Sequence, residues 1–170
     1  PAGAGTRGPQ RHSFYVAIWV TAGEGQHFVD FDGCQIKPNA LHFVRPGQLQ
    51  YWAIARPLKG YLLCFDEQIY HRHGLERFLN QLSFLKPFSP SAIFHFSSEE
   101  ATTIQHMVEE ILIEAGSPRR GQEVAILSWL NLLLLAGQRR SANLAGAGSG
   151  EQLTNQFLCL VDEQAISEHS

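Results

Sequence analysis

The chain has 170 residues, of which 44% are hydrophobic and 17% charged, and its formal net charge at pH 7 is −3. This length suits one compact domain with short tails, and the apolar share excludes an intrinsically disordered chain. Free-standing nucleic-acid binders normally carry a basic face, so we do not expect this segment to grip DNA by itself.

The first half of the sequence has the pattern of a β-sandwich or barrel. Residues 1–12 contain three glycines, two prolines and no periodic apolar pattern, so residues 1–13 are expected to form a flexible N-terminal arm. From Phe14 to about Phe65, short apolar runs alternate with turn signals. Turns are expected at Ala22–Gly25, at Asp32-Gly33 and around Pro57. We expect strands over 14–21, 26–31, 34–37, 41–45, 48–55 and 58–65, with a returning strand over 93–96.

The second half of the sequence has helical patterns. One or two short helices are expected within 66–86, and the capping-box pair Ser97 and Glu100 begins a helix that runs to about Ala115. A further helix over about 122–140 is apolar almost all round and should be largely buried. Residues 141–150 have the composition of a flexible linker, and an apolar helical spacing follows them. The expected organisation is an arm (1–13), a barrel with a helical insertion at about 66–86 (14–96), a helical dimerisation region (97–141), and a linker and stub (142–170).

Cysteine usage and hydropathy indicate a reduced, cytoplasmic protein. The three cysteines, Cys34, Cys64 and Cys159, match no zinc-ligand spacing, and their number is odd. The sequence has no signal-peptide pattern and no apolar run long enough to span a membrane.

Three segments resemble the sensor part of AraC-type bacterial transcription regulators. Gly23–Phe31 resembles that family's G-x-G-x-H-x-V-D-F run, and Ile36–Gln48 is similar to its P-x-x-L-x-F-x-x-P-G-Q stretch. Leu153–Asp162 resembles the segment that leads into the family's paired helix-turn-helix domain. The segments occur in the family's order, and the resemblance covers about residues 14–167.

The resemblance implies a fold and a function. The implied fold class is mainly β with C-terminal helices (α+β), a cupin-like β-barrel or jelly roll followed by two long helices. The implied function is ligand sensing and dimerisation: a small effector binds in the barrel and controls DNA binding by a C-terminal helix-turn-helix domain outside this chain. The implied partners are the effector, a second copy of the chain and, through the missing domain only, DNA.

The alternative function is a cupin-type metal-dependent enzyme, an isomerase or a dioxygenase. Such enzymes hold the metal with two histidines and a glutamate on one strand and a third histidine on a later strand. Here His27 occupies the first position, but Val29 and Gln50 stand where two other ligands are expected, and a neutral amide is a poor metal ligand. We therefore expect no metal, no cofactor and no catalytic residue. His71 and His73 are two residues apart, which does not bring them together on a helix, so they are expected to be exposed.

The alternation of side chains along each strand indicates which residues could line a pocket, because inward side chains of a small barrel either fill it or surround a ligand. Polar and aromatic residues on an inward face are informative, since a buried polar group needs a partner. On the first strand, Trp19 shares a face with Tyr15 and Ala17, and we interpret this face as the ligand side. The opposite face, interpreted as plain core, carries Phe14, Val16, Ile18 and Val20.

Later strands supply the other candidates. If His27 points inward, then Val29 and Phe31 share its face, and Gln50 shares its face with Trp52. The parity of residues 41–45 stays open, and an inward arginine there would suit a carboxylated ligand. The candidate ligand-binding residues are Trp19, His27, His42, Arg45, Gln50 and Trp52. The alternative is that each is a satisfied core or outer-surface residue.

The two long helices also leave two interpretations open. Either both bury their apolar surface against the barrel, or part of it packs on a second copy around a two-fold axis. Because the resemblance implies dimerisation, we favour the second interpretation. The candidate interface residues are Ile104, Val108, Ile111, Leu130 and Leu134.

Overall fold

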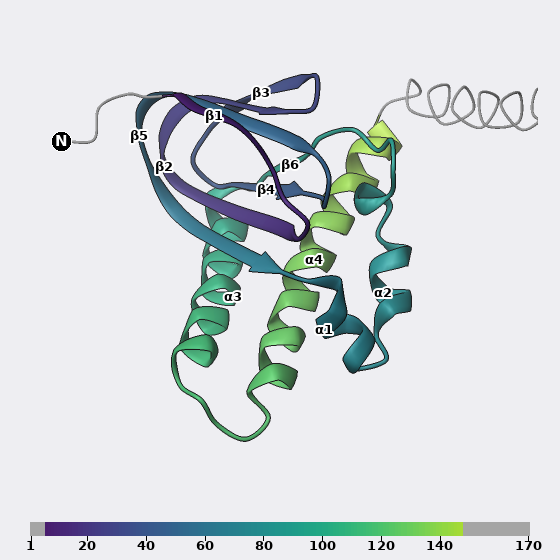
Figure 1. Cartoon of the computed structure of the whole chain (residues 1–170). Helices are drawn as coiled ribbons and strands as arrows, with labels where there is room; N and C mark the ends of the chain where they lie inside the picture. Colours follow the sequence, from purple (N-terminus) through teal and green to yellow (C-terminus); the bar gives the residue numbers. More distant parts are fainter. Residues whose placement is uncertain (1–5, 148–170) are drawn as a thin grey trace, which may run out of the picture.

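The structure is a computed structural model that describes residues 6–147, with side chains described for residues 8–144. Its six strands form one antiparallel sheet in the order β1-β5-β2-β4-β6, with β3 paired to β2. The strands are β1 (Thr6–Arg11), β2 (Tyr15–Val29), β3 (Asp32–Ile36), β4 (Ala40–Val44), β5 (Leu49–Phe65) and β6 (Ala92–His95). Figure 1 shows the sheet curling over two long helices that lie beneath it. The fold is a cupin-like β-sandwich followed by helices, as the sequence predicted.

Two long bent strands replace four short predicted ones. β2 and β5 pair from Tyr15 opposite Phe65 to Val29 opposite Gln50, so the predicted turn at 22–25 and the break at Pro57 are wrong. Register shifts between Val20 and Gly25 bend the pair without ending it. Gly25 lets the backbones of β2 and β5 approach closely, because a Cβ at this position would overlap the carbonyl oxygen of Ala53.

The N-terminal segment forms an edge strand. Residues 6–11, which the sequence placed in a flexible arm, make up β1 and pair with β5 from Thr6 opposite Ala53 to Arg11 opposite Leu49. Residues 1–5 of the predicted arm lie outside the described residues. An edge strand is held by backbone hydrogen bonds to a free sheet edge, which requires no apolar periodicity in its own sequence.

The helices follow the strands as predicted, with one difference at the end. They are α1 (Glu67–Arg72), α2 (Glu76–Gln81), a 3-10 turn η1 (Ser83–Leu85), α3 (Ser98–Gly116) and α4 (Gln122–Ala147). The capping box of α3 is confirmed, because Ser97 Oγ accepts from the Glu100 amide at 3.2 Å and the Glu100 carboxylate accepts from the Ser97 amide at 2.8 Å. α4 continues through residue 147, so the first part of the predicted 141–150 linker is helical. The rest of that linker and the predicted final helix lie outside the described residues.

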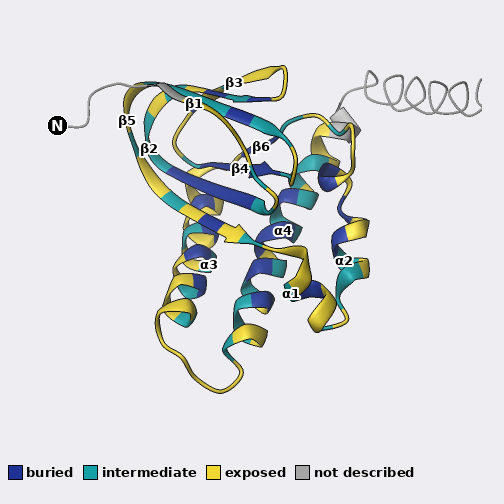
Figure 2. Ribbon diagram, in the orientation of Figure 1, coloured by how far each residue is buried: buried dark blue, intermediate teal, exposed yellow. Residues whose placement is uncertain are grey.

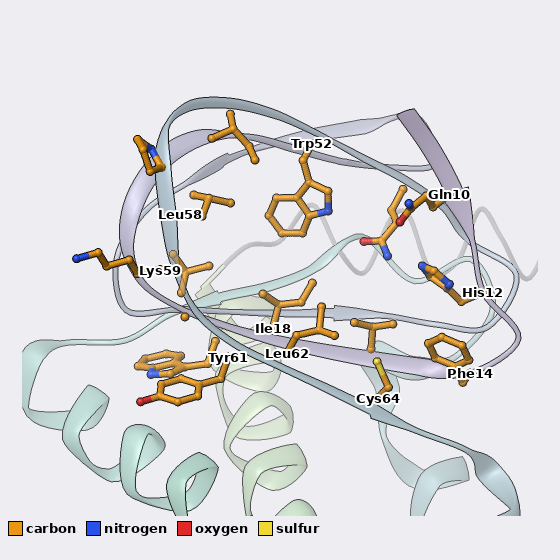
Figure 3. A pocket seen from close by; sticks show the side chains of 17 residues that line it. Gln10, His12, Phe14, Ile18, Trp52, Leu58, Lys59, Tyr61, Leu62 and Cys64 are labelled. Atoms are coloured by element: carbon orange, nitrogen blue, oxygen red, sulfur yellow. The ribbon is translucent and has the colours of Figure 1, made fainter. Parts of the chain in front are cut away.

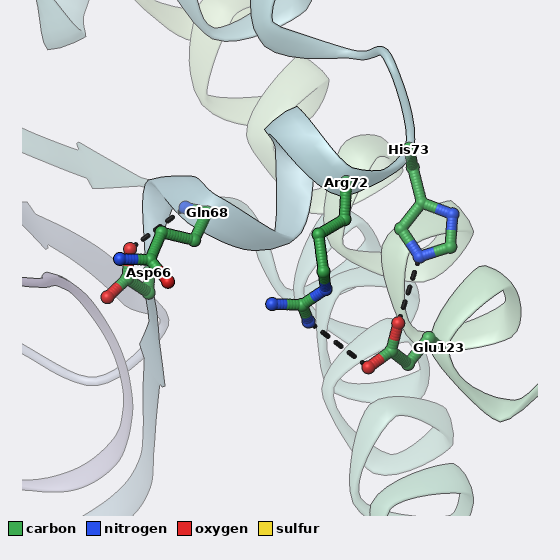
Figure 4. Close-up of polar contacts among 5 residues, drawn as sticks. All are labelled: Asp66, Gln68, Arg72, His73 and Glu123. Atoms are coloured by element: carbon green, nitrogen blue, oxygen red, sulfur yellow. Dashed lines mark hydrogen bonds and ion pairs between the residues drawn. The ribbon is translucent and has the colours of Figure 1, made fainter.

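A carboxylate joins the beginning of α4 to the end of α1 (Figure 4). Glu123 accepts from Arg72 Nη2 at 3.1 Å and lies 3.0 Å from His73 Nε2. The hydrogen bond from His73 and the charge of Arg72 hold the pKa of Glu123 below its ordinary value. His71 is exposed, as predicted, and lies 3.6 Å from Glu67. His73, also predicted to be exposed, is half-buried, because it packs at the end of α1 against Glu123. These contacts fix the short helices beside the long ones, away from the interior of the sheet.

The two faces of β2 and β4 are buried against different partners. Figure 2 shows β4 and the first half of β2 buried, and the second half of β2 partly exposed. The face toward the helices carries Ala17, Trp19, Leu41 and Phe43, packed in the large core with α3 and α4. The face toward the interior of the curved sheet carries a smaller cluster: Val16, Ile18, Val20, Val29, Ile36 and Val44. The interior is therefore lined by the β2 face that the sequence analysis assigned to plain core.

The five predicted dimer-interface residues belong to the large core of this chain. Their side chains are at most 6% exposed, so none is available to a second copy and the prediction is wrong for them. The residues are Ile104, Val108, Ile111, Leu130 and Leu134. Most of the apolar surface of α4 packs on α3 and on the sheet. This agrees with the other interpretation of the sequence, in which both helices bury their apolar surface against the barrel.

Two simpler features complete the fold. Among the described residues, Cys34 and Cys64 are free thiols. No helix in the described part of the chain is long and apolar enough to cross a membrane.

Candidate functional site: the interior of the curved sheet

A pocket of about 680 Å³ opens into the interior of the curved sheet. This size lies within the ordinary range for small-molecule sites. Its wall is mostly apolar and comes from β2, β5 and the residue before β2: Phe14, Val16, Ile18, Val20, Ile54, Leu58 and Leu62. Figure 3 shows Trp52 reaching into the pocket from above, with Gln10 and His12 at one end. Lys59 lies at the other end and points out of the cavity.

Three polar side chains form a buried chain of hydrogen bonds beside this pocket. His27 Nε2 lies 3.0 Å from Gln50 Oε1, and His27 Nδ1 lies 3.0 Å from His42 Nδ1. All three side chains are buried. They come from neighbouring strands, and the indole of Trp52 stacks on His27 with ring centroids 3.7 Å apart. The structure thus brings together four of the six predicted ligand-binding residues.

The positions of the protons follow from the donor and acceptor types. The Gln50 carbonyl oxygen only accepts, so His27 donates from Nε2 and accepts at Nδ1. His42 then donates from Nδ1, which leaves His42 Nε2 as a buried nitrogen with no partner among the described residues. The reverse amide orientation would bury an N–H of His42 without an acceptor, and orphaned buried N–H groups are rare.

Burial keeps both histidines neutral. It lowers the pKa of His27 to about 4, an effect that the hydrogen bond to Gln50 partly opposes. Burial lowers the pKa of His42 to about 3, with smaller contributions from His27 and His95. At neutral pH, the polar cluster beside the pocket therefore carries hydrogen-bonding groups but no charge.

The cupin metal position is not reproduced by these residues. His27 turns one ring nitrogen to Gln50 and the other to His42, so no single point is close to all three potential ligands. Within the described part of the chain, no group of three or more His, Cys, Asp or Glu side chains is placed to hold a metal ion. The donor set does not fit a bound metal, and we derive no chemistry through one.

Of the six predicted ligand-binding residues, Trp19, Gln50 and Trp52 line the pocket, whereas His27, His42 and Arg45 do not. Trp19 borders the pocket, but its indole packs in the large core and donates to Gln105 Oε1 at 2.6 Å, so the ligand-side assignment of its face is wrong. Arg45 does not line the pocket, and burial lowers the pKa of its guanidinium. Phe31, predicted to point inward, is fully exposed. The sequence left open which residues of 41–45 point inward. In the structure they are His42, which lies beside His27, and Val44, which belongs to the interior cluster.

Sequence reasoning missed the contribution of the N-terminal segment. Gln10 on β1, with His12 and Phe14 just after it, lines the pocket, and the rings of His12 and Phe14 stack at 4.8 Å. The only available signal was the apolar run that begins at Phe14, which was interpreted as core.

Comparisons with known proteins identify relatives of this fold. Residues 3–134 match the family model of the AraC-like ligand binding domain. Two similar solved structures are of YcfD, a ribosomal oxygenase from Escherichia coli, one in complex with cobalt and 2-oxoglutarate and the other with cobalt and succinic acid. Their sequence identities to this chain are 17% and 16%, each with a TM-score of 0.34. The alignments cover 64% and 74% of this chain but only 36% and 38% of those proteins. No curated protein matches the chain.

Proposed function

Because the chain belongs to the family of AraC-like ligand-binding domains, we propose that its pocket binds a small effector. Binding there controls DNA binding by a helix-turn-helix domain of the same regulator, which works in the cytoplasm. The observation that carries the proposal is the pocket itself, which combines an apolar wall with a few polar groups, among them the buried amide of Gln50. Effector sites in proteins typically have this composition.

The effector signal passes through β1. This strand lies at the edge of the sheet and pairs only with β5, while Gln10 and the residues just after it form one end of the pocket. An effector that contacts this end stabilises β1 against the sheet, and the response requires different effector affinity for the docked and undocked states.

We also propose that the domain forms a homodimer through the outer face of α4. Along this helix, Val124, Ser128 and Leu132 recur every fourth residue, and Val124 and Leu132 are 55% and 44% exposed. Leu132 lies near the middle of α4. An antiparallel pair of α4 helices around a two-fold axis would bury this seam and place the two copies of Leu132 close to the axis.

The proposal assigns no catalysis to this domain. Its buried histidines face each other and an amide, and Trp52 stacks on His27. Metal analysis of the purified protein separates this proposal from the metal-dependent enzyme. A stoichiometric metal ion whose removal also abolishes an enzymatic activity would contradict the proposal.

A thermal-shift screen over sugars, organic acids, aromatic acids and antibiotics tests effector binding. A ligand that binds only the folded state raises the unfolding midpoint in proportion to the logarithm of its concentration. We expect at least one class to raise the midpoint in this way. A screen in which no compound does so contradicts the proposal.

A further inference from the structure

The hydrogen-bonding groups that Gln50 and Trp52 present to the pocket are donors. The carbonyl oxygen of Gln50 is engaged by His27, so the NH₂ of the same amide is left for the pocket that Gln50 lines. The indole N–H of Trp52 makes no hydrogen bond to another described residue, and the ring reaches into the pocket (Figure 3). An indole N–H only donates.

The buried histidines hold this arrangement in place. To present its carbonyl oxygen instead, Gln50 would have to turn its NH₂ toward His27 Nε2, which would reverse both histidine tautomers. His42 would then carry an N–H at Nε2, where no acceptor lies among the described residues. Leaving a buried donor without a partner is strongly unfavourable, so the amide is fixed as a donor.

No lysine or arginine side chain points into the pocket among the described residues. Lys59 points out of the cavity, and His12 lies beside Phe14 at the end that Gln10 also forms. Arg45, which the sequence analysis linked to a carboxylated ligand, does not line the pocket. A carboxylate brought to Gln50 would lose its hydration without gaining an opposite charge, which is strongly unfavourable.

We propose that the pocket takes an uncharged, largely apolar ligand whose carbonyl or ether oxygen accepts hydrogen bonds from the Gln50 amide and the Trp52 indole. This inference rests on the proposed effector site and adds the chemical class of the effector. The apolar wall binds the body of the ligand, and the two donors orient its oxygen.

The test uses displacement of Nile red, an uncharged dye that fluoresces in apolar surroundings, by three compounds of equal chain length. Decanamide and methyl decanoate are uncharged and carry an acceptor oxygen, whereas decanoate is ionised at pH 7.5. We expect the two uncharged compounds to displace the dye at concentrations at least tenfold lower than decanoate. Displacement by decanoate at an equal or lower concentration overturns the inference and leaves the effector site standing.

A pair of matched variants locates the effect. Gln50→Glu keeps an acceptor for His27 but replaces the donor NH₂, so it should weaken displacement by decanamide at least tenfold. Gln35→Glu adds the same charge at an exposed position on β3 and should leave displacement unchanged. Equal displacement from both variants overturns the inference. If Nile red shows no saturable binding to the wild-type chain, the proposed effector site itself fails, and the inference with it.

Discussion

At the scale of single residues, the buried histidines make folding sensitive to pH. Their pKa values are about 4 and about 3 in the folded state, against an ordinary value of 6.5. As the pH falls below 6.5, the unfolded chain takes up protons that the folded chain excludes. We therefore predict that the free energy of unfolding falls between about pH 6.5 and pH 4, by about 3 kcal/mol from His27 alone. Urea denaturation over this pH range measures the change.

Two variants separate this effect from general acid denaturation. The double variant His27→Leu and His42→Leu removes both titrating groups and should show a shallower decline of stability over the same range. His71→Gln removes a histidine whose side chain is 56% exposed and should keep the wild-type decline. A double variant as pH-sensitive as the wild type would count against neutral buried histidines.

Sequence reasoning identified the polar cluster but misjudged a neighbouring face. His27, Gln50 and Trp52 were predictable because alternation along a strand fixes which residues share a face. Trp19 was not, because parity separates the two faces of a strand without saying which one meets the helices. In this fold both faces of β2 are buried, so burial pattern gives no further signal.

At the scale of elements, β1 is the part that an effector should affect most. We predict that a bound effector slows amide hydrogen exchange in residues 6–14, because this segment is an edge strand and supplies one end of the pocket. α2, which does not line the pocket, should exchange at the same rate with and without effector. Exchange in 6–14 that is unaffected by a saturating effector would exclude β1 as the route of the signal.

Most elements were predictable from periodicity, and the exceptions share a cause. β1 and the bent middle of β2 and β5 are stabilised by backbone pairing and by close approach at Gly25, neither of which produces an apolar pattern. The helix beyond residue 140 was missed because its alanines and serine were counted as linker composition. Alanine is also the strongest helix former, so composition alone does not distinguish the two.

At the scale of the whole molecule, the proposed homodimer uses exposed apolar residues of α4. The predicted interface residues are in the core, because an apolar stripe does not reveal whether its partner is the same chain or another. The outward residues of α4 replace them in the proposal.

We predict that Leu132→Glu converts a dimer into a monomer, because a charge near the two-fold axis is opposed by its own copy. Leu112→Glu is the matched control, since Leu112 is 41% exposed on α3, outside the seam, and this variant should remain dimeric. Sedimentation equilibrium gives the masses. A monomeric wild type, or a Leu132→Glu variant that stays dimeric, would rule out this interface.

We propose above that the interior of the curved sheet binds an effector beside Trp52. Isothermal titration of the compound selected by the thermal-shift screen tests it with two adjacent variants on β5. Trp52→Ala removes a pocket-lining ring, whereas Tyr51→Ala removes a ring that stacks on Phe28 at 4.4 Å and does not line the pocket. We expect at least a tenfold loss of affinity for Trp52→Ala and wild-type affinity for Tyr51→Ala. Wild-type affinity in Trp52→Ala would contradict the proposal.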